Sequence, residues 1–216
     1  MNRSTASVVG ITLAAAIALA GCSKAHKTDA EASQAALGDA IVVDPTMTAE
    51  GNPAPQAIAA ARKAAVNLAG EIRALPAPIK GSASQLSANA AAAAQITPAA
   101  RTAKTDCAAK VQYDKGWAGK LPAELPLYPQ AAVQEAAGTD GDGCALRVVS
   151  FGTPVDQLDV IGFYRTMALK AGYSADYRLD GSDQVLGGKR GGQAYVVYAR
   201  KQANGLTEVD LVTSGR

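Results

Sequence analysis

Large aromatic side chains are confined to one half of this 216-residue chain: the two Phe, the one Trp and the seven Tyr all lie at or beyond Tyr113. A hydrophobic core depends on large side chains, and 48 of the apolar residues are Ala, whose methyl group fills little space. We therefore expect the packed core in the last half of the chain, with targeting, tether and Ala-rich helical segments before it. This distribution excludes a two-domain globular enzyme that fills the whole length.

The N-terminus has the features of an export signal. Arg3 supplies a positive charge, and residues 8–20 form an uninterrupted apolar or neutral run. As a helix this run rises roughly 20 Å, which is too short to span about 30 Å of hydrocarbon. The pattern predicts a secretory signal rather than a stable membrane span.

The apolar run ends in Leu19-Ala20-Gly21-Cys22, which resembles the lipobox of bacterial lipoproteins. The resemblance implies that residues 1–21 are a signal peptide cleaved between Gly21 and Cys22. It also implies that Cys22 receives a diacylglycerol on its thiol and a further acyl chain, such as palmitate, on its new amine. Several acyl chains hold a protein on a membrane essentially permanently.

The residue after the lipobox guides sorting in Gram-negative lipoproteins, where Asp favours retention in the inner membrane. This chain has Ser23 at that position. For a Gram-negative host, the resemblance therefore implies an outer-membrane protein that faces the periplasm. Ordinary signal cleavage after Ala18-Leu19-Ala20 is the alternative.

Residues 22–55 are composed mainly of Ala, Ser, Thr, Asp, Gly and Pro, with few large apolar side chains. This composition predicts a disordered tether, and a flexible chain of this length reaches about 30 Å. His26, the only His of the chain, falls in the tether, and we interpret it as a solvated residue. No metal or cofactor is expected.

Residues 56–104 are rich in Ala and Pro and are predicted to form a helical linker. Helices are expected at residues 56–75, before Pro76, and near residues 84–96. The first helix has a narrow apolar seam made of Ile58, Ala61, Ala65, Leu68, Ile72 and Leu75. The seam favours docking on the C-terminal domain or on the second helix, and a coiled-coil partner is the alternative.

Residues 105–216 are predicted to form an α+β domain: a small antiparallel sheet with one helix packed on a face, in the order β-β-α-β-β-β-β. The helix is expected to begin at Thr153-Pro154, with Thr153 as N-cap, and to end at Gly172. Hairpin turns are expected at residues 140–143 and 204–205. The strands are expected at residues 132–137, 144–151, 173–179, 184–187, 194–200 and 206–213.

Cys107 and Cys144 are the two cysteines that remain once Cys22 is assigned to lipid. An exported chain enters an oxidising compartment, so we expect a disulfide between them. A redox or metal-binding pair is the alternative, but redox sites usually have C-x-x-C spacing and zinc needs further Cys or His ligands. The disulfide would close a loop of about 38 residues and contribute roughly 4 kcal/mol.

Residues 125–172, with the runs LPLYPQAAV, FGTP and FYRTMALKAGY, look like a module that recurs in exported bacterial proteins. The resemblance implies a small α+β module and no activity. A looser similarity is to the helix-grip domains of outer-membrane assembly lipoproteins, which also follow a long tether. No residue motif carries the function of those proteins over to this chain.

The sequence contains few patterns that are typical of catalytic or nucleic-acid-binding sites. Its 21 Lys and Arg nearly balance its 19 Asp and Glu without a concentrated basic patch, so nucleic acid is not an expected partner. The C-terminal domain has no His and no hydrolase, zinc-protease or P-loop motif, so no enzyme is expected. Lys189 and Arg190, within the glycine-rich residues 187–192, and Tyr198 are candidate ligand or partner contacts. A simple hairpin loop is the alternative for residues 187–192.

Two main hypotheses follow for function. The first is a lipid-anchored envelope protein that acts as a periplasmic interaction or structural module with a protein partner. The alternative is a lipoprotein that binds a small ligand in the cleft between its helix and sheet. A hydrolase with an aspartate-based or metal-dependent site is a third alternative, and no residue pattern indicates an oligomeric state.

Overall fold

The structure is a computed structural model, and it describes residues 52–216. The predicted signal peptide, lipobox and most of the tether, with Cys22 and His26, lie outside the described residues. The helices are α2 (Pro55–Ala69), α3 (Ser84–Ala94), α4 (Pro98–Thr102) and α5 (Gln157–Lys170), with 3₁₀ turns η1 (Ala108–Lys110) and η2 (Lys115–Lys120). The strands are β1 (Ile79–Lys80), β2 (Gln112–Tyr113), β3 (Ala132–Thr139), β4 (Leu146–Thr153), β5 (Asp176–Asp180), β6 (Asp183–Arg190), β7 (Gln193–Lys201) and β8 (Thr207–Ser214).

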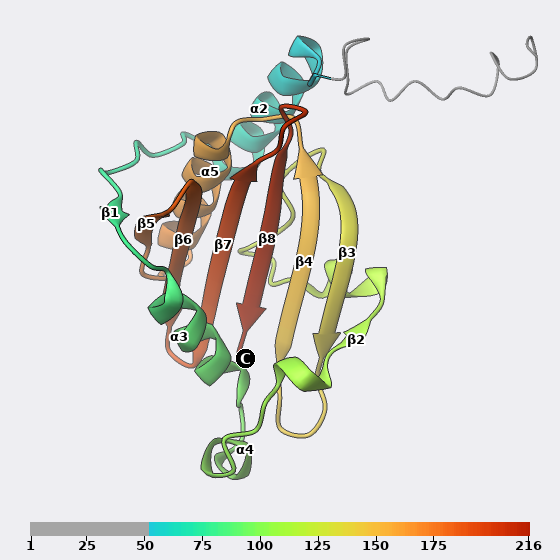
Figure 1. Ribbon diagram of the computed structural model, residues 1–216, viewed down its shortest axis with the longest axis vertical. Helices are drawn as coiled ribbons and strands as arrows, with labels where there is room; N and C mark the ends of the chain where they lie inside the picture. The colour runs from blue at the N-terminus through green and yellow to red at the C-terminus, as the bar shows by residue number, and fades with distance from the viewer. Residues whose placement is uncertain (1–51) are drawn as a thin grey trace, which may run out of the picture. The chain divides into compact units, whose positions relative to one another are not determined.

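In this part of the chain the strands form one eight-stranded sheet in the order β1-β5-β6-β7-β8-β4-β3-β2 (Figure 1). Every pair is antiparallel except β1 with β5. The predicted α+β class with a mostly antiparallel sheet is therefore confirmed. The six predicted strands overlap six of the eight, and β1 and β2 add short segments at the two edges, where a two-residue pairing gives little sequence signal.

The two faces of the sheet both carry helices, whereas the sequence predicted cover on one face. Helix α5 packs on the face that we call the rear face, and α3 crosses the opposite face, the front face, which is toward the viewer in Figure 1. Alternation along β7 shows the division: Tyr195 and Val197 belong to the core under α5, and Val196 packs with α3. Tyr198 lies on the same face as Val196, so the two tyrosines face opposite ways, as their spacing predicts.

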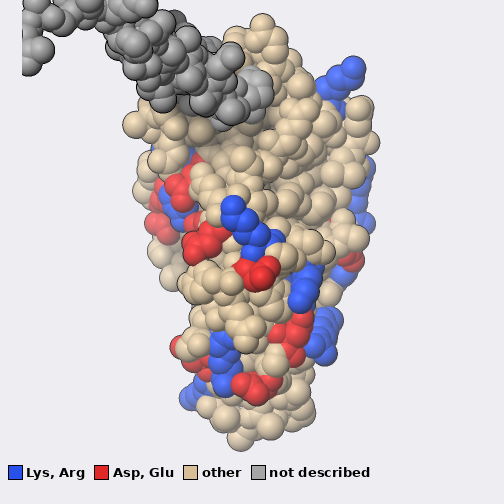
Figure 2. Space-filling view, turned by 90° about the vertical axis from the view of Figure 1, so that its right-hand side faces the viewer, with Lys and Arg blue, Asp and Glu red and all other residues tan. Residues whose placement is uncertain are grey.

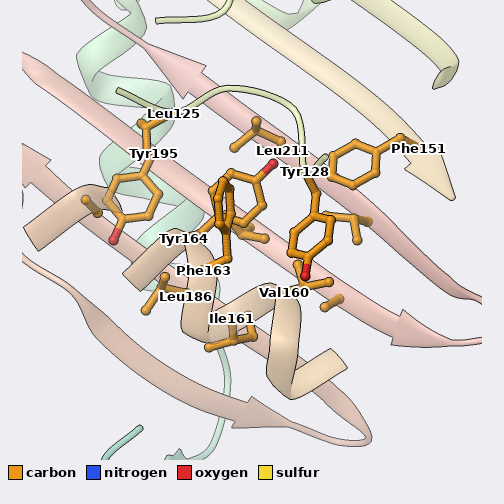
Figure 3. Packing of buried hydrophobic residues seen from close by; sticks show 14 of the residues in the cluster. Leu125, Tyr128, Phe151, Val160, Ile161, Phe163, Tyr164, Leu186, Tyr195 and Leu211 are labelled. Atoms are coloured by element: carbon orange, nitrogen blue, oxygen red, sulfur yellow. The ribbon is translucent and has the colours of Figure 1, made fainter. Parts of the chain in front are cut away.

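The rear face holds the main core of the domain. Phe163 of α5 makes edge-to-face contacts with Tyr128 and Tyr164, at centroid distances of 5.0 and 5.1 Å. Leu125 and Tyr128 come from the extended segment before β3, which lies over this face beside α5 (Figure 3). Eight of the ten aromatic residues therefore belong to one continuous core, and Tyr113 and Tyr198 lie outside it.

The start of α5 differs from the prediction. Thr153 remains in β4, where it pairs with Thr207 of β8, and the helix begins later. Asp156 is the N-cap: its carboxylate accepts the N–H of Leu158 at 3.0 Å, and Asp159 accepts the N–H of Asp156 at 3.3 Å. This capping box satisfies N–H groups at the helix start, which Thr153 is not placed to serve. The predicted end is confirmed, since Gly172 follows the C-cap with φ of 82°.

Helix α2 is shorter than predicted and buries most of the predicted seam. It ends at Ala69 because the C-cap residue Gly70, with φ of 73° and ψ of −154°, has a backbone conformation that glycine adopts readily and that ends the helix. Of the predicted seam, Ala61 and Ala65 are buried and pack with α5, and three larger residues pack against the same core: Ile58, Ile72 and Leu75. Leu68 is the exception, since it is 53% exposed and Ala69 is buried instead. The seam therefore docks on the C-terminal domain, as predicted.

The predicted glycine-rich loop is mostly strand. Gly187, Gly188, Lys189 and Arg190 belong to β6, and the turn begins only after them. The glycines are required by neighbours: a Cβ at Gly188 would lie 1.8 Å from the carbonyl oxygen of Ser174, and one at Gly187 would lie 3.1 Å from Leu86 of α3. The chain and a helix both approach the strand too closely for side chains there.

The surface of the domain carries charges of both signs side by side, as Figure 2 shows. Ion pairs near the β2–β3 edge include Lys110 with Asp142 at 2.9 Å and Arg147 with Asp140 at 2.7 Å.

Among residues 52–216, no helix is long and apolar enough to cross a membrane.

Candidate functional site

The space between α5 and the rear face, which the sequence suggested as a ligand cleft, is occupied by side chains. Phe163, Tyr164 and Tyr195 are at most 1% exposed there. Burial raises the pKa of Tyr164 and Tyr195, which keeps both phenols neutral. This face stabilises the fold and leaves little room for a ligand.

The front face has a hollow between α3, residues 104–108 and the sheet, which we call the α3 pocket. Its volume is about 300 Å³. Val148, Val196 and Val212 line it from β4, β7 and β8, and small residues such as Ala91 line it from α3. A mostly apolar lining with a few polar groups, at the lower end of the usual volume range, is typical of small-molecule sites.

The α3 pocket exists because the two ends of α3 are held differently. Near its start, Leu86 packs tightly over Gly187. Farther along, the residues of α3 that face the sheet are Ala90 and Ala94, whose methyl groups do not fill the space above the valines. A helix that approaches the sheet closely at its first turn and presents only alanine methyl groups afterwards leaves a hollow.

The far wall of the α3 pocket is cross-linked. Cys107 and Cys144, the pair predicted from the sequence, lie at disulfide distance, with Sγ atoms 2.05 Å apart. Cys144 also forms a β-bridge with Gln95, just after α3, and the Gln95 amide donates to the carbonyl oxygen of Thr105 at 3.0 Å. The end of α3 and residues 104–108 are thus fixed to the sheet, so the pocket is held open by covalent and backbone contacts.

Polar groups lie at the rim of the α3 pocket. The hydroxyls of Ser87 and Tyr198 are 2.5 Å apart and share a hydrogen bond. Asp106 accepts the backbone N–H groups of Ala108 and Ala109 at 3.0 and 3.3 Å, so one of its oxygens is committed to the turn. Lys104 is exposed and forms no ion pair with any residue that the structure describes.

A second hollow adjoins the first on the front face, and we call it the β3 pocket. Its volume is about 230 Å³. Glu135, Ala137 and Tyr113 line it from β3 and β2. It shares the lining residues Ala108, Leu146 and Val148 with the α3 pocket. The two hollows therefore meet beside the cross-linked segment.

A charged cluster borders the apolar part of the front face. The Arg200 guanidinium lies 2.6 Å from Asp210 and 3.2 Å from Asp183, and Ser150 donates to Asp210 at 2.5 Å. These side chains are each partly exposed and mutually paired. We interpret the cluster as a polar border that stabilises the sheet face rather than as a reaction centre.

The three residues that the sequence suggested as contacts do not come together. Arg190 bonds to Glu124 at 2.8 Å and lies 4.4 Å from the Tyr173 ring, and its hydrogen bond lowers the pKa of the Glu124 carboxyl. Lys189 lies on the opposite face of the strand, beside a separate hollow that contains Gly191. Of the three, Tyr198 alone lines the α3 pocket.

Acidic residues of β5 also have structural partners. Asp180 accepts the backbone N–H of Ala83 at 2.8 Å, just before α3, and Asp176 pairs with Arg178 at 3.1 Å. Within residues 52–216, no group of three or more His, Cys, Asp and Glu side chains is arranged to hold a metal ion.

No sequence motif indicates the α3 pocket, and the helix expected near residues 84–96 has the composition of a linker. The signal that could have indicated the pocket has two parts. Ala90 and Ala94 are small residues on one face of a helix, and Val196 and Val212 are strand valines outside the aromatic core. Whether these residues meet depends on which face of the sheet the helix reaches, which the sequence alone does not specify.

Comparison of the chain with protein-family models, with curated proteins and with solved structures finds no match.

Proposed function

We propose that this chain is a lipid-anchored protein of the cell envelope that binds a small, mostly apolar molecule in the α3 pocket. The observation that carries the proposal is the hollow of about 300 Å³ over Val148, Val196 and Val212. It is preformed, since the Cys107–Cys144 link and the contacts of Gln95 hold its walls. Preformed apolar pockets bind ligands at a low cost in ordering.

The binding test uses an uncharged fluorescent probe, N-phenyl-1-naphthylamine, whose emission rises in apolar surroundings. Ala91 and Ala92 are neighbours on α3 and both are exposed, but of the two only Ala91 lines the α3 pocket. The Ala91→Phe variant should weaken probe binding about tenfold or more, and Ala92→Phe should bind like the wild type. Equal binding by both variants, or no binding by the wild type, would contradict the proposed site.

Membrane anchoring rests on Leu19-Ala20-Gly21-Cys22 and is tested separately. The Cys22→Ser variant should be exported but released from membranes, because it lacks the thiol that receives lipid. If it remains in the membrane fraction, the anchoring part of the proposal is wrong. Outer-membrane residence, inferred from Ser23, is tested by density fractionation of the wild type.

A protein-binding role is the second candidate. Val66 of α2 and Leu158 of α5 are 48% and 51% exposed, and both line a hollow of about 320 Å³ between these helices. Exposed apolar residues at one hollow are a feature of protein contact sites. In-cell crosslinking from position 66 should then capture one stoichiometric partner, and no capture would argue against this role.

A further inference from the structure

The apolar floor of the front face is a straight row that crosses the sheet. Val196 pairs in register with Val212, Val212 with Val148, and Val148 with Ala137. These four residues come from β7, β8, β4 and β3, which are consecutive strands. With strands about 4.8 Å apart, the row is roughly 14 Å long. At its β3 end Tyr113, paired with Ala137, extends it further.

A polar row runs beside the apolar one. Tyr198 pairs with Asp210, Asp210 with Ser150, and Ser150 with Glu135, again across β7, β8, β4 and β3. Three of the four are hydrogen-bonded or ion-paired, as described above, and Glu135 is exposed. The front face therefore offers a narrow apolar strip with a polar border, rather than a broad apolar surface.

The shape of the strip selects among apolar ligands. The α3 pocket and the β3 pocket lie along it, with volumes of about 300 and 230 Å³, and they meet at Ala108 and Val148. A compact ring system would occupy one hollow and leave the other empty. A slender, unbranched chain could lie across both and cover the whole row.

The charges beside the two pockets differ. The rim of the α3 pocket carries both signs: Lys104 has no ion-pair partner among the described residues, and one carboxylate oxygen of Asp106 is committed to the turn at Ala108 and Ala109. Glu135 is the charged residue that lines the β3 pocket. An anionic head group can pair with Lys104 at the α3 pocket and would be repelled by Glu135 at the β3 pocket. This complementarity gives the ligand a direction along the row.

We infer that the ligand is a single-chain acyl anion, such as a fatty acid, with its head group beside Lys104 and its chain across Val212 and Val148 toward Ala137. The inference rests on the proposed function, since it names the ligand class of the same site. It differs from the proposed function in requiring both pockets, a linear chain and a negative head.

The experiment compares decanoate with adamantane-1-carboxylate, a compact acid of similar carbon count, by calorimetry. The full-length chain carrying Cys22→Ser serves as the parent, so that no detergent competes. Val111 lines the β3 pocket but not the α3 pocket, and its exposed neighbour Gln112 lines neither. Val111→Phe should weaken decanoate binding about tenfold and leave the compact acid, held in the α3 pocket, within about twofold, and Gln112→Phe should change neither.

The head group is tested with Lys104→Gln, which should weaken decanoate about tenfold and leave uncharged decanol unaffected. If the compact acid binds as tightly as decanoate and Val111→Phe affects both equally, the linear ligand is excluded. If N-phenyl-1-naphthylamine binds in an Ala91-dependent way but decanoate does not bind, the acyl anion is excluded while the proposed function stands. Failure of both ligands removes both proposals.

Discussion

The two faces of the sheet are built from the same strands, but one is filled by a core and the other holds a pocket. Under α5 the strands meet aromatic and branched side chains, and Phe163 and Leu211 are fully buried. Under α3 the strands meet alanines, and a hollow of about 300 Å³ remains over the valines. Alternate residues of one strand therefore contribute to a filled core and to an open pocket. The size of the side chains on the covering helix decides which face can bind a ligand.

The largest difference between the faces should appear in stability. Phe163→Ala on the rear side should lower the free energy of unfolding by about 3–5 kcal/mol, because it opens a cavity in a filled core. Val212→Ala on the front side should cost about 1 kcal/mol or less, because the removed methyl groups border space that is already empty. Urea unfolding of both variants provides the measurement, and equal costs would contradict the contrast.

The disulfide should affect the front face specifically. Replacing Cys107 and Cys144 together by Ala should lower stability by about 2–4 kcal/mol, since the loop between them, with a sequence separation of 37, is released in the unfolded chain. Because the link also fixes the wall of the α3 pocket, probe binding should weaken even at temperatures where the variant stays folded. Alkylation of the exported wild type without reductant checks the premise, and two free thiols there would refute it.

The glycine-rich residues provide a third comparison. Gly188→Ala should destabilise the protein by about 1–3 kcal/mol, because the new methyl group meets the Ser174 carbonyl oxygen. A methyl group at Gly192 would meet no atom within 4 Å beyond its chain neighbours, so Gly192→Ala should change stability by less than about 0.5 kcal/mol. Thermal unfolding distinguishes strand from loop: similar tolerance at both positions would favour the loop.

The smallest effect is expected at the Glu124–Arg190 pair, at the margin of the rear face. The hydrogen bond from Arg190 lowers the pKa of Glu124 from its usual value near 4.5. The pair therefore contributes stability above that usual pKa, and the contribution is lost as the pH falls through the lowered value. Glu124→Gln should be slightly less stable than the wild type near neutral pH, and the difference should vanish in acid. A difference that persists or grows in acid would show that Glu124 acts through packing.

Sequence patterns predicted the rear face better than the front. The aromatic distribution located the core, and Gly172 and the turn at residues 204–205 were placed correctly. The start of α5 was predicted three residues too early. Thr153 is paired with Thr207 in the sheet, and Asp156 and Asp159 form the capping box instead.

The front face depends on contacts that periodicity does not encode. Ala91 of α3 and Ala108 of η1 meet the strands only through the folding of a segment that composition marks as a linker. The glycines of β6 are typical of a turn in the sequence, but they lie in a strand. Gly188 is needed there because a side chain would collide with the carbonyl oxygen of Ser174. A pocket built from Ala and Val has no motif, so its position became visible only in the folded chain.

The most direct test of the binding account is methyl NMR of the protein titrated with N-phenyl-1-naphthylamine. Val196 and Val197 are adjacent in β7 and face opposite sides, as do Val212 and Leu211 in β8. Binding in the α3 pocket should shift the methyl signals of Val196 and Val212 and leave those of Val197 and Leu211 in place. Shifts confined to Val197 and Leu211, or no shifts at saturating probe, would contradict a ligand site on the front face.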